Sequence, residues 1–352
     1  MSRFRLWTFR IFCVLFGLLF LMLFAGFIYE QVGRAEDTKH LPRRVGQAID
    51  VGGRTMNLYC SGEGAPTVIF ETGGNESGYS WALIQPRIAA FTRACWYDRA
   101  GVGWSDPPST PRTSTSVISD LHTMLQRAGE FPPYVLVGAS IGGEYVRIYT
   151  ARYPADVAGV VLVDATNPDQ QEPAFMQGIS ERMSPRVRHL LCVAVPTMAR
   201  FGVLRLVASR MGGSDASQAN TEQADILSRL EAQPKALRAN AEQACASTEE
   251  GRVTPTRGSG NPELDNAARN VSSLGDRPLI VLTAGRFWAP AGLEKESAEF
   301  HDVWVHQLQN SLVHLSTHGR QTIVDAYHDM SDAPDAVVTA TQQVVEETHA
   351  PK

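Results

Sequence analysis

The segment that most constrains the fold of this chain is a strand, a tight turn and a helix that follow one another without a gap. Residues 134–137 are apolar and typical of a buried strand, and Gly138-Ala139-Ser140-Ile141-Gly142 follows directly. The spacing then predicts a helix over residues 143–153. A strand that is apolar on both faces and runs into a helix is typical of a parallel sheet covered by helices.

The same alternation continues along most of the chain and predicts the α/β class. Strands are expected over residues 47–51, 54–60, 67–70, 94–97, 160–163, 278–283 and 321–326, and further helices over 80–91, 115–128 and 334–347. From about 166 to 275 the sequence is polar and helix-prone without clear strands, which predicts an inserted helical cap. We therefore expect one domain, residues 45–350, with a mostly parallel sheet, helices on both faces and this cap.

The N-terminus predicts a membrane anchor. Residues 11–29 form an uncharged apolar run, which as a helix would span roughly 28 Å, close to the thickness of a bilayer's hydrocarbon core. Arg3, Arg5 and Arg10 precede it, no convincing signal-peptidase site follows, and the run is long for a signal peptide. We expect a retained anchor over residues 1–30, a charged linker over 31–44 and a globular domain outside the cytoplasm, although basic residues on the second flank weaken this orientation.

Charge and cysteine content narrow the classes of partner and compartment. The net charge is −5, and no basic block lies beyond the N-terminus, so nothing favours a nucleic-acid partner and a small-molecule ligand is expected. Besides Cys13 in the anchor, four cysteines remain: Cys60, Cys95, Cys192 and Cys245. This even number is compatible with two disulfides in an oxidising compartment, and equally with four buried thiols.

The Gly-x-Ser-x-Gly turn predicts a nucleophile at Ser140. Between a strand and a helix, such a turn has a strained backbone that lifts the serine side chain out of the sheet. The general base of this arrangement comes last in the chain, after the final strand, and His328 stands there. Four other histidines fall in a predicted helix and its exit and are expected to be solvated or structural: His301, His306, His314 and His318.

A serine nucleophile also requires donors for the oxyanion that forms during attack. One is the backbone N–H of the residue after the nucleophile, Ile141, and the other comes from the loop after the third strand. That loop begins Thr72-Gly73-Gly74-Asn75, and Gly74 is the most suitable donor.

The third member of the triad should be a carboxylate that orients the histidine. The loop after residues 278–283 is its usual place, but residues 284–290 contain no acid, and the first to follow is Glu294. Asp164 ends the preceding strand, residues 160–163, in a loop that also opens toward the nucleophile. We predict Asp164, and Glu294 and Glu296 remain alternatives.

Several motifs resemble the lipase and esterase-like branch of the α/β-hydrolase superfamily. They are residues 64–71 (GAPTVIFE), 97–105 (YDRAGVGWS), the nucleophile turn and 161–165 (VLVDA). The similarity extends from about residue 45 to 345 apart from the cap. Ala139 departs from the pattern, because such proteins commonly carry histidine there. Family members whose acid follows the preceding strand support Asp164.

The resemblance has two further implications. Its sheet order would place Cys60 beside Cys95, which makes that pair a candidate disulfide, and would leave Cys192 and Cys245 in the cap. In this fold, the Asp98-Arg99 turn is more often structural than catalytic, so neither residue is predicted to act in the reaction.

These observations predict hydrolysis of a carboxylic ester through an acyl-enzyme on Ser140. No metal or organic cofactor is implied. Alkyl halides and epoxides are not expected as substrates, because the relatives that open them use an aspartate nucleophile. An amidase or aminopeptidase-like hydrolase would use the same residues, and a non-catalytic membrane-tethered binding module is the alternative from another class.

Overall fold

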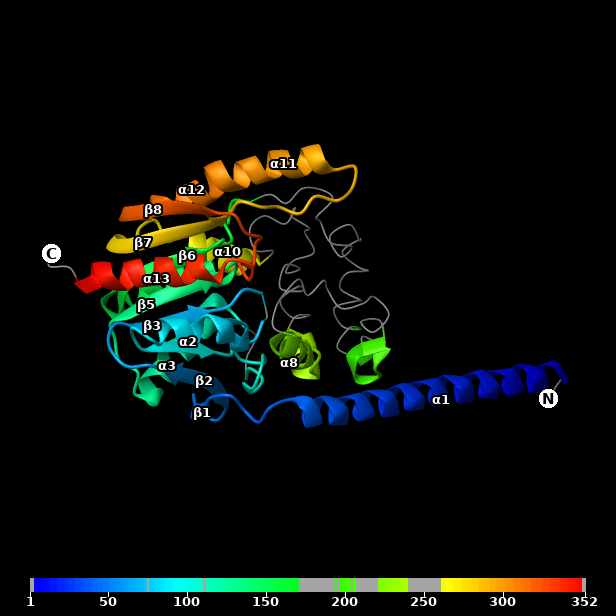
Figure 1. The fold of residues 1–352 in the computed structure, drawn as a ribbon. Helices are drawn as coiled ribbons and strands as arrows, with labels where there is room; N and C mark the ends of the chain where they lie inside the picture. Colours follow the sequence, from blue (N-terminus) through cyan, green and yellow to red (C-terminus); the bar gives the residue numbers. More distant parts are fainter. Residues whose placement is uncertain are drawn as a thin grey trace.

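The computed structural model describes residues 3–74, 76–109, 112–170, 194, 197–203, 205–206, 221–239 and 261–349. Its centre is an eight-stranded sheet of order β1-β2-β4-β3-β5-β6-β7-β8 (Figure 1). The pairs β1–β2 and β2–β4 are antiparallel and all others parallel. The strands are β1 (Gln47–Asp50), β2 (Thr55–Ser61), β3 (Thr67–Glu71), β4 (Ala94–Tyr97), β5 (Tyr134–Ala139), β6 (Val157–Val163), β7 (Gly275–Ala284) and β8 (Ser316–Val324).

Helices cover both faces of the sheet and bury a separate apolar core on each. On one face lie α3 (Ser114–Ala128), α4 (Gly142–Arg152), α10 (Pro262–Arg269) and α12 (Asn310–Val313). The other face is covered by η1 (Gly78–Leu83), α2 (Gln85–Ile88) and α13 (Pro334–His349). The central strands β3, β5 and β6 are buried along nearly their whole length, which explains their continuous apolar sequences. The predicted α/β class is therefore confirmed.

Strands β6 and β7 each begin three residues before their predicted start, and two further elements of the domain differ more from their predicted extent. Residues 80–91 were expected to form one helix, but they form η1 and the short α2, which begins with Pro86 in its first turn. Strand β8 begins at Ser316, five residues before its predicted start, and includes His318. Its first residues are polar, and apart from the buried Ser316 they are exposed or partly exposed, as an edge strand permits, so they carry no apolar signal.

Helix α1 (Arg3–His40) extends from the domain, and its part Trp7–His40 is long and apolar enough to cross a membrane. It continues through most of residues 31–44, where we expected a linker. Charged pairs along the helix, such as Arg34 with Glu30 and Lys39 with Glu36, stabilise this part without an apolar face. Pro42 follows the helix end, in keeping with the bias of the residue before a proline against helix.

The predicted cap, residues 166–275, lies largely outside the described residues. Its described parts include residues 197–203, α8 (Thr221–Glu231), whose Gln223 donates to the Tyr79 and Ser80 carbonyls of η1, and α10. Helix α10 packs against α4, with Leu264 in the core, so it belongs to the helical layer of the sheet rather than to the cap. The remaining cap boundary stays a prediction.

Candidate active site

Ser140 lies at the carboxyl end of β5, in the turn that leads into α4. Its φ of 50° is in the left-handed region, which is strained for a residue with a side chain. The backbone is held there by bonds from Ser140 N to the Val163 carbonyl and from Gly143 and Thr166 N to the Ser140 carbonyl. This turn therefore presents the side chain at the edge of the sheet.

The glycines around Ser140 are required by close packing. A Cβ on Gly138 would lie 2.7 Å from the Gly142 carbonyl oxygen, and one on Gly142 would lie 2.5 Å from the Thr72 carbonyl oxygen. On Gly143 it would lie 2.3 Å from Cβ of Ala165. Because none of these positions has room for a side chain, strand, helix and neighbouring loop can approach one another closely enough to form the site.

The structure brings the predicted nucleophile, base and acid into one chain of hydrogen bonds. Ser140 Oγ lies 3.0 Å from Nε2 of His328, and Nδ1 of His328 lies 2.6 Å from Oδ2 of Asp164. His328 comes from the loop between β8 and α13, and Asp164 directly follows β6. In the tautomer that suits this geometry, Ser140 donates to His328 and His328 donates to Asp164.

Asp164 is almost fully buried, and hydrogen bonds to both oxygens hold its carboxylate in place. Oδ1 accepts from the backbone N of Ala284 and from Nε1 of Trp304, both at 2.9 Å, which leaves Oδ2 for His328. Glu294 and Glu296, the alternatives, lie exposed at the start of α11 (Glu294–Val303), where Glu294 accepts from the N–H of Gly292. The structure thus joins Asp164, and neither glutamate, to the histidine.

The pKa of His328 is raised above 6.5 by its surroundings. Desolvation alone would lower this pKa, but the hydrogen bond and the negative charge of Asp164 outweigh it. Glu76 and Asp329 add further negative charge nearby. A raised pKa makes the ring a stronger proton acceptor, which suits a general base.

The two predicted oxyanion donors flank Ser140. The Ser140 carbonyl points into α4, where it accepts from Gly143, so the Ile141 N–H of the same planar peptide points the opposite way. The Gly73 carbonyl accepts from Nη2 of Arg99 at 2.9 Å, so the Gly74 N–H points away from Arg99. Ser140 lies beside this loop, since a Cβ on Gly73 would be 3.2 Å from Ser140 Cβ.

Arg99 belongs to the turn after β4 that was predicted to be structural. Its guanidinium is 2% exposed and donates to the carbonyl oxygens of Thr72, Gly73 and Gly74. It also donates to Oε1 of Glu71 at 2.5 Å. Burial raises the pKa of Glu71, while the Arg99 charge acts in the opposite direction. One buried cation therefore fixes three successive peptide groups of the loop that carries Gly74, the predicted oxyanion donor.

Asp98 has the structural role that the sequence suggested. Its buried carboxylate accepts from the Gly78 and Trp104 N–H groups, at 2.8 and 2.9 Å, and from the Ser77 hydroxyl at 2.6 Å. These bonds hold the turn after β4 against the start of η1.

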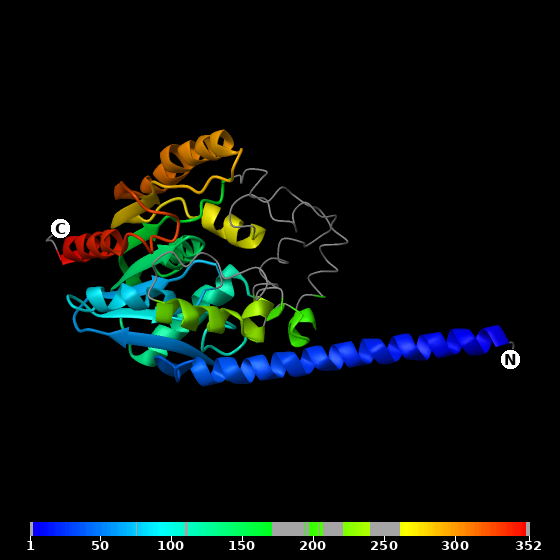
Figure 2. The same ribbon diagram turned by 45° about the vertical axis from the view of Figure 1, so that its right-hand side comes forward.

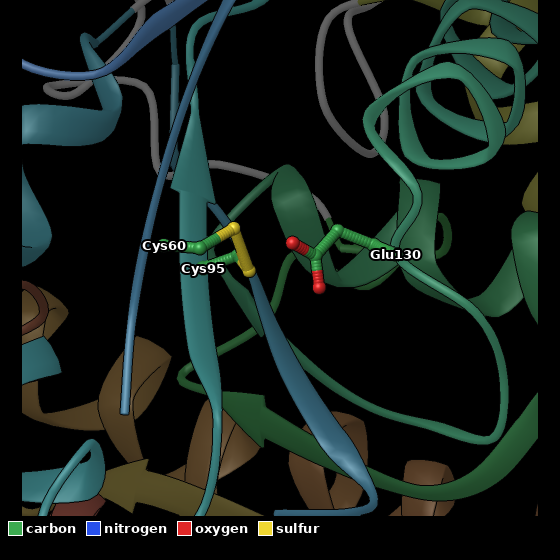
Figure 3. Close-up of side chains that lie close together, drawn as sticks. All are labelled: Cys60, Cys95 and Glu130. Carbon is green, nitrogen blue, oxygen red and sulfur yellow. A yellow bond between two sulfur atoms is a disulfide. The ribbon is translucent and has the colours of Figure 1, made fainter. Parts of the chain in front are cut away.

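Cys60 and Cys95 form a disulfide between β2 and β4, which confirms the predicted pair (Figure 3). Cys192 and Cys245 lie outside the described residues. Glu130 lies beside this disulfide, and such a trio could in principle bind a metal. The two sulfurs are bonded to each other and are not thiolates, and Arg93 donates to both oxygens of Glu130, so these atoms do not form a metal site.

Comparisons with known proteins agree with this architecture. The family described as alpha/beta hydrolase fold matches residues 66–206. The uncharacterized protein YbdG of Bacillus subtilis is 26% identical over 183 residues, which are 51% of this chain and 56% of that protein. The uncharacterized vacuolar membrane protein YNL115C of Saccharomyces cerevisiae is 29% identical over 124 residues, 34% of this chain and 19% of the yeast protein. The matches thus span little more than half of these relatives at most.

Solved structures resemble the fold but differ in reaction. A thermophilic esterase from Thermogutta terrifontis aligns with a TM-score of 0.57 at 16% identity, covering 88% of this chain and 100% of that one. An ancestral haloalkane dehalogenase aligns with a TM-score of 0.60 at 18% identity, covering 86% and 100%. The chain therefore has the α/β-hydrolase fold, and the reaction must be inferred from its own residues.

Proposed function

We propose that this protein is a serine hydrolase that cleaves a carboxylic ester through an acyl-enzyme on Ser140. The observation that carries the proposal is the continuous chain from Ser140 Oγ through His328 to Asp164, with separations of 3.0 and 2.6 Å. His328 takes the proton of Ser140 as the oxygen attacks the ester carbonyl, and Asp164 stabilises the imidazolium that forms. His328 then gives the proton to the leaving alcohol.

The second half of the reaction uses the same residues. A water molecule attacks the acyl carbonyl, His328 takes its proton, and the return of that proton to Ser140 releases the carboxylic acid. In both steps the N–H groups of Ile141 and Gly74 stabilise the oxyanion. Arg99 acts as a positioning residue, because it holds the carbonyls of the Gly74 loop and so directs the N–H groups toward the substrate. No metal or organic cofactor takes part in this proposal.

The serine at the nucleophile turn distinguishes this chain from the enzymes that open alkyl halides and epoxides. Their reactions require attack by a carboxylate, which forms an ester that water then cleaves. The side chain at the turn is a hydroxyl, which suits acyl transfer instead. A silent binding module would not require an aligned triad, so the geometry favours an enzyme.

We propose that α1 anchors the enzyme to a membrane with the domain outside the cytoplasm. The most apolar stretch of α1 is not buried against the described part of the domain, and its length suits a bilayer. The description of the yeast relative as a vacuolar membrane protein is compatible with this anchor.

An aminopeptidase-like hydrolase is the second candidate, because the carboxyl group of Glu76 lies near Ser140 and Glu231 lies near Glu76. The point 3.2 Å from Ser140 Cβ, where Gly73 would carry a Cβ, is also 3.8 Å from Oε1 of Glu76. On α8, burial and the nearby Glu76 charge raise the pKa of Glu231 to about 7. Carboxylates placed in this way would attract a substrate amine. If Glu76→Gln lowers cleavage of an aminoacyl anilide far more than of a neutral ester, this candidate is favoured.

Labelling with a fluorophosphonate tests the proposed function. The probe reacts only with an activated serine, so the wild type should be labelled, Ser140→Ala should not, and Asp164→Asn should react far more slowly. Glu294→Gln is the matched control and should label like the wild type. Absence of labelling in folded wild-type protein would contradict the proposal and favour a binding module.

A further inference from the structure

The described part of the cap nearest to the candidate anchor packs directly on α1. Residues 197–203, 205 and 206, here called the cap segment, lie beside the C-terminal half of α1 in both views (Figures 1 and 2). A Cβ on Gly26 would lie only 2.5 Å from the Phe201 carbonyl oxygen, and one on Gly33 only 2.5 Å from Nε of Arg205. Because glycine occupies both positions, the cap segment reaches the surface of the helix.

Ion pairs hold the cap segment in this position. Glu30 is 2% exposed, and Nε of Arg205 donates to its Oε2 at 3.1 Å. Nη2 of Arg205 also donates to Asp37 at 2.7 Å, and Arg229 of α8 lies 3.4 Å from the same carboxylate. Arg34 of α1 donates to the other oxygen of Glu30, so both oxygens of this buried carboxylate are paired, and the geometry of the arginine contacts fixes where the cap segment lies along α1.

The contacts fix the depth of the cap segment relative to a bilayer. Gly26 and Tyr29, which touch Phe201 and Gly202, belong to the apolar run 11–29. At 1.5 Å per residue, Gly26 lies about 4–5 Å inside the end of that run at Tyr29. The boundary between hydrocarbon and headgroups therefore lies at the cap segment. Tyr29 is 43% exposed there, as tyrosines at membrane interfaces commonly are.

The outward residues of the cap segment suit this boundary. Leu206 is 45% exposed and Phe201 is partly exposed, so both offer apolar surface. Arg200 is exposed as well, and an arginine at this depth can extend its guanidinium to lipid phosphates while its stem remains in apolar surroundings.

We propose that the cap segment is a membrane-contact surface that seats in the lipid headgroup region beside α1. The occupant is the bilayer itself, because the contacts place this surface at the end of the apolar helix. The loop that carries His328 lies at the end of the sheet toward the cap, and α1 leaves the domain in the same direction (Figures 1 and 2). On the proposed function, the site then faces the bilayer and receives amphiphilic esters whose chains remain in it.

Depth-dependent fluorescence quenching tests this contact in the full chain. Cys13, Cys192 and Cys245 are changed to Ser, the Cys60–Cys95 disulfide is retained, and Leu206→Cys carries an NBD probe. The protein is placed in phosphatidylcholine nanodiscs with or without lipids doxyl-labelled near the headgroup. Glu346→Cys, exposed near the end of α13, is the matched control.

The NBD group at position 206 should emit at shorter wavelength than at 346 and be quenched by doxyl lipid, whereas the probe at 346 should not. Arg205→Gln should reduce quenching at 206. Equal, water-like emission at both positions would overturn the proposal. Fluorophosphonate labelling of each variant shows, independently of the quenching, that the protein is folded and that its serine reacts as the proposed function requires. Co-elution with nanodiscs shows that α1 attaches the protein to the bilayer. A labelled, nanodisc-bound protein without quenching at 206 therefore refutes the membrane contact alone.

Discussion

The two sides of Ser140 use buried charges in different ways. Asp164 and Arg99 are each 2% exposed, and each holds one part of the site. Asp164 bonds directly to the His328 side chain, whereas Arg99 bonds to the backbone carbonyls of the oxyanion loop. On the proposed function, the first arrangement sets both the orientation and the proton affinity of the general base. The second sets only the direction of N–H dipoles, so its loss should disturb transition-state stabilisation without changing the titration of the base.

The largest expected loss of activity comes from substitution of Ser140, because both the His328 side and the oxyanion side act on this nucleophile. Ser140→Ala removes the nucleophile and should lower kcat by about 10⁶-fold, the order found when a triad serine is lost. Hydrolysis of a p-nitrophenyl ester measures this effect. Activity that persists in this variant would mean that neither the Asp164–His328 pair nor the loop held by Arg99 takes part in catalysis.

On the histidine side, Asp164→Asn should lower kcat by about 10³- to 10⁴-fold. The amide preserves size but favours the wrong imidazole tautomer and removes the stabilising charge. Glu294→Gln and Glu296→Gln should leave kcat unchanged, because both residues are exposed on α11. A larger loss in either glutamate variant than in Asp164→Asn would reassign the acid.

On the oxyanion side, Arg99→Lys should lower kcat by about 10- to 100-fold with little change in KM. Lysine keeps the charge but lacks the planar group that bonds several carbonyls together. Affinity for a boronic acid that mimics the tetrahedral intermediate should fall in parallel with kcat, while thermal unfolding confirms that the variant is folded. If KM alone changes, or boronate affinity is retained, Arg99 does not position the donors.

The smallest effect is a shift in pH dependence that separates the two sides. The reaction needs neutral His328, so kcat/KM should rise with pH through a midpoint above 6.5, because the pKa is raised. Asp164→Asn removes the contact that raises this pKa, and the midpoint should move to lower pH. In Arg99→Lys the midpoint should stay at the wild-type value. Equal shifts of this midpoint in both variants would contradict the difference in role between Asp164 and Arg99.

The difference between side-chain and backbone contacts also explains which parts of the site could be predicted from the sequence. Ser140 is marked by its turn after an apolar strand, and His328 by its place after the final strand, and both signals can be read along the chain. Asp164 remained one of three acids, because the choice depends on which loop approaches the histidine. Arg99 was predicted to be structural, but the loop that it holds was not predicted, since its partners are backbone carbonyls some 25 residues away in sequence, and a carbonyl has no signature in the sequence.

The fold likewise has elements that could be predicted from the sequence and elements that could not. Parallel strands could be located from their apolar runs, and the Cys60–Cys95 pair from the strand order of the resembling family. The polar start of β8 and the helical continuation of α1 to His40 lacked such patterns, because edge position and charge pairs stabilise them instead.

Detection of the acyl-enzyme tests the central claim most directly. The protein is mixed with excess p-nitrophenyl ester and quenched in acid within the first turnover, and its intact mass and peptides are measured. We predict one added acyl group on the peptide that contains Ser140, absent from Ser140→Ala. Turnover without a covalent adduct, or an adduct on another residue, would contradict the account.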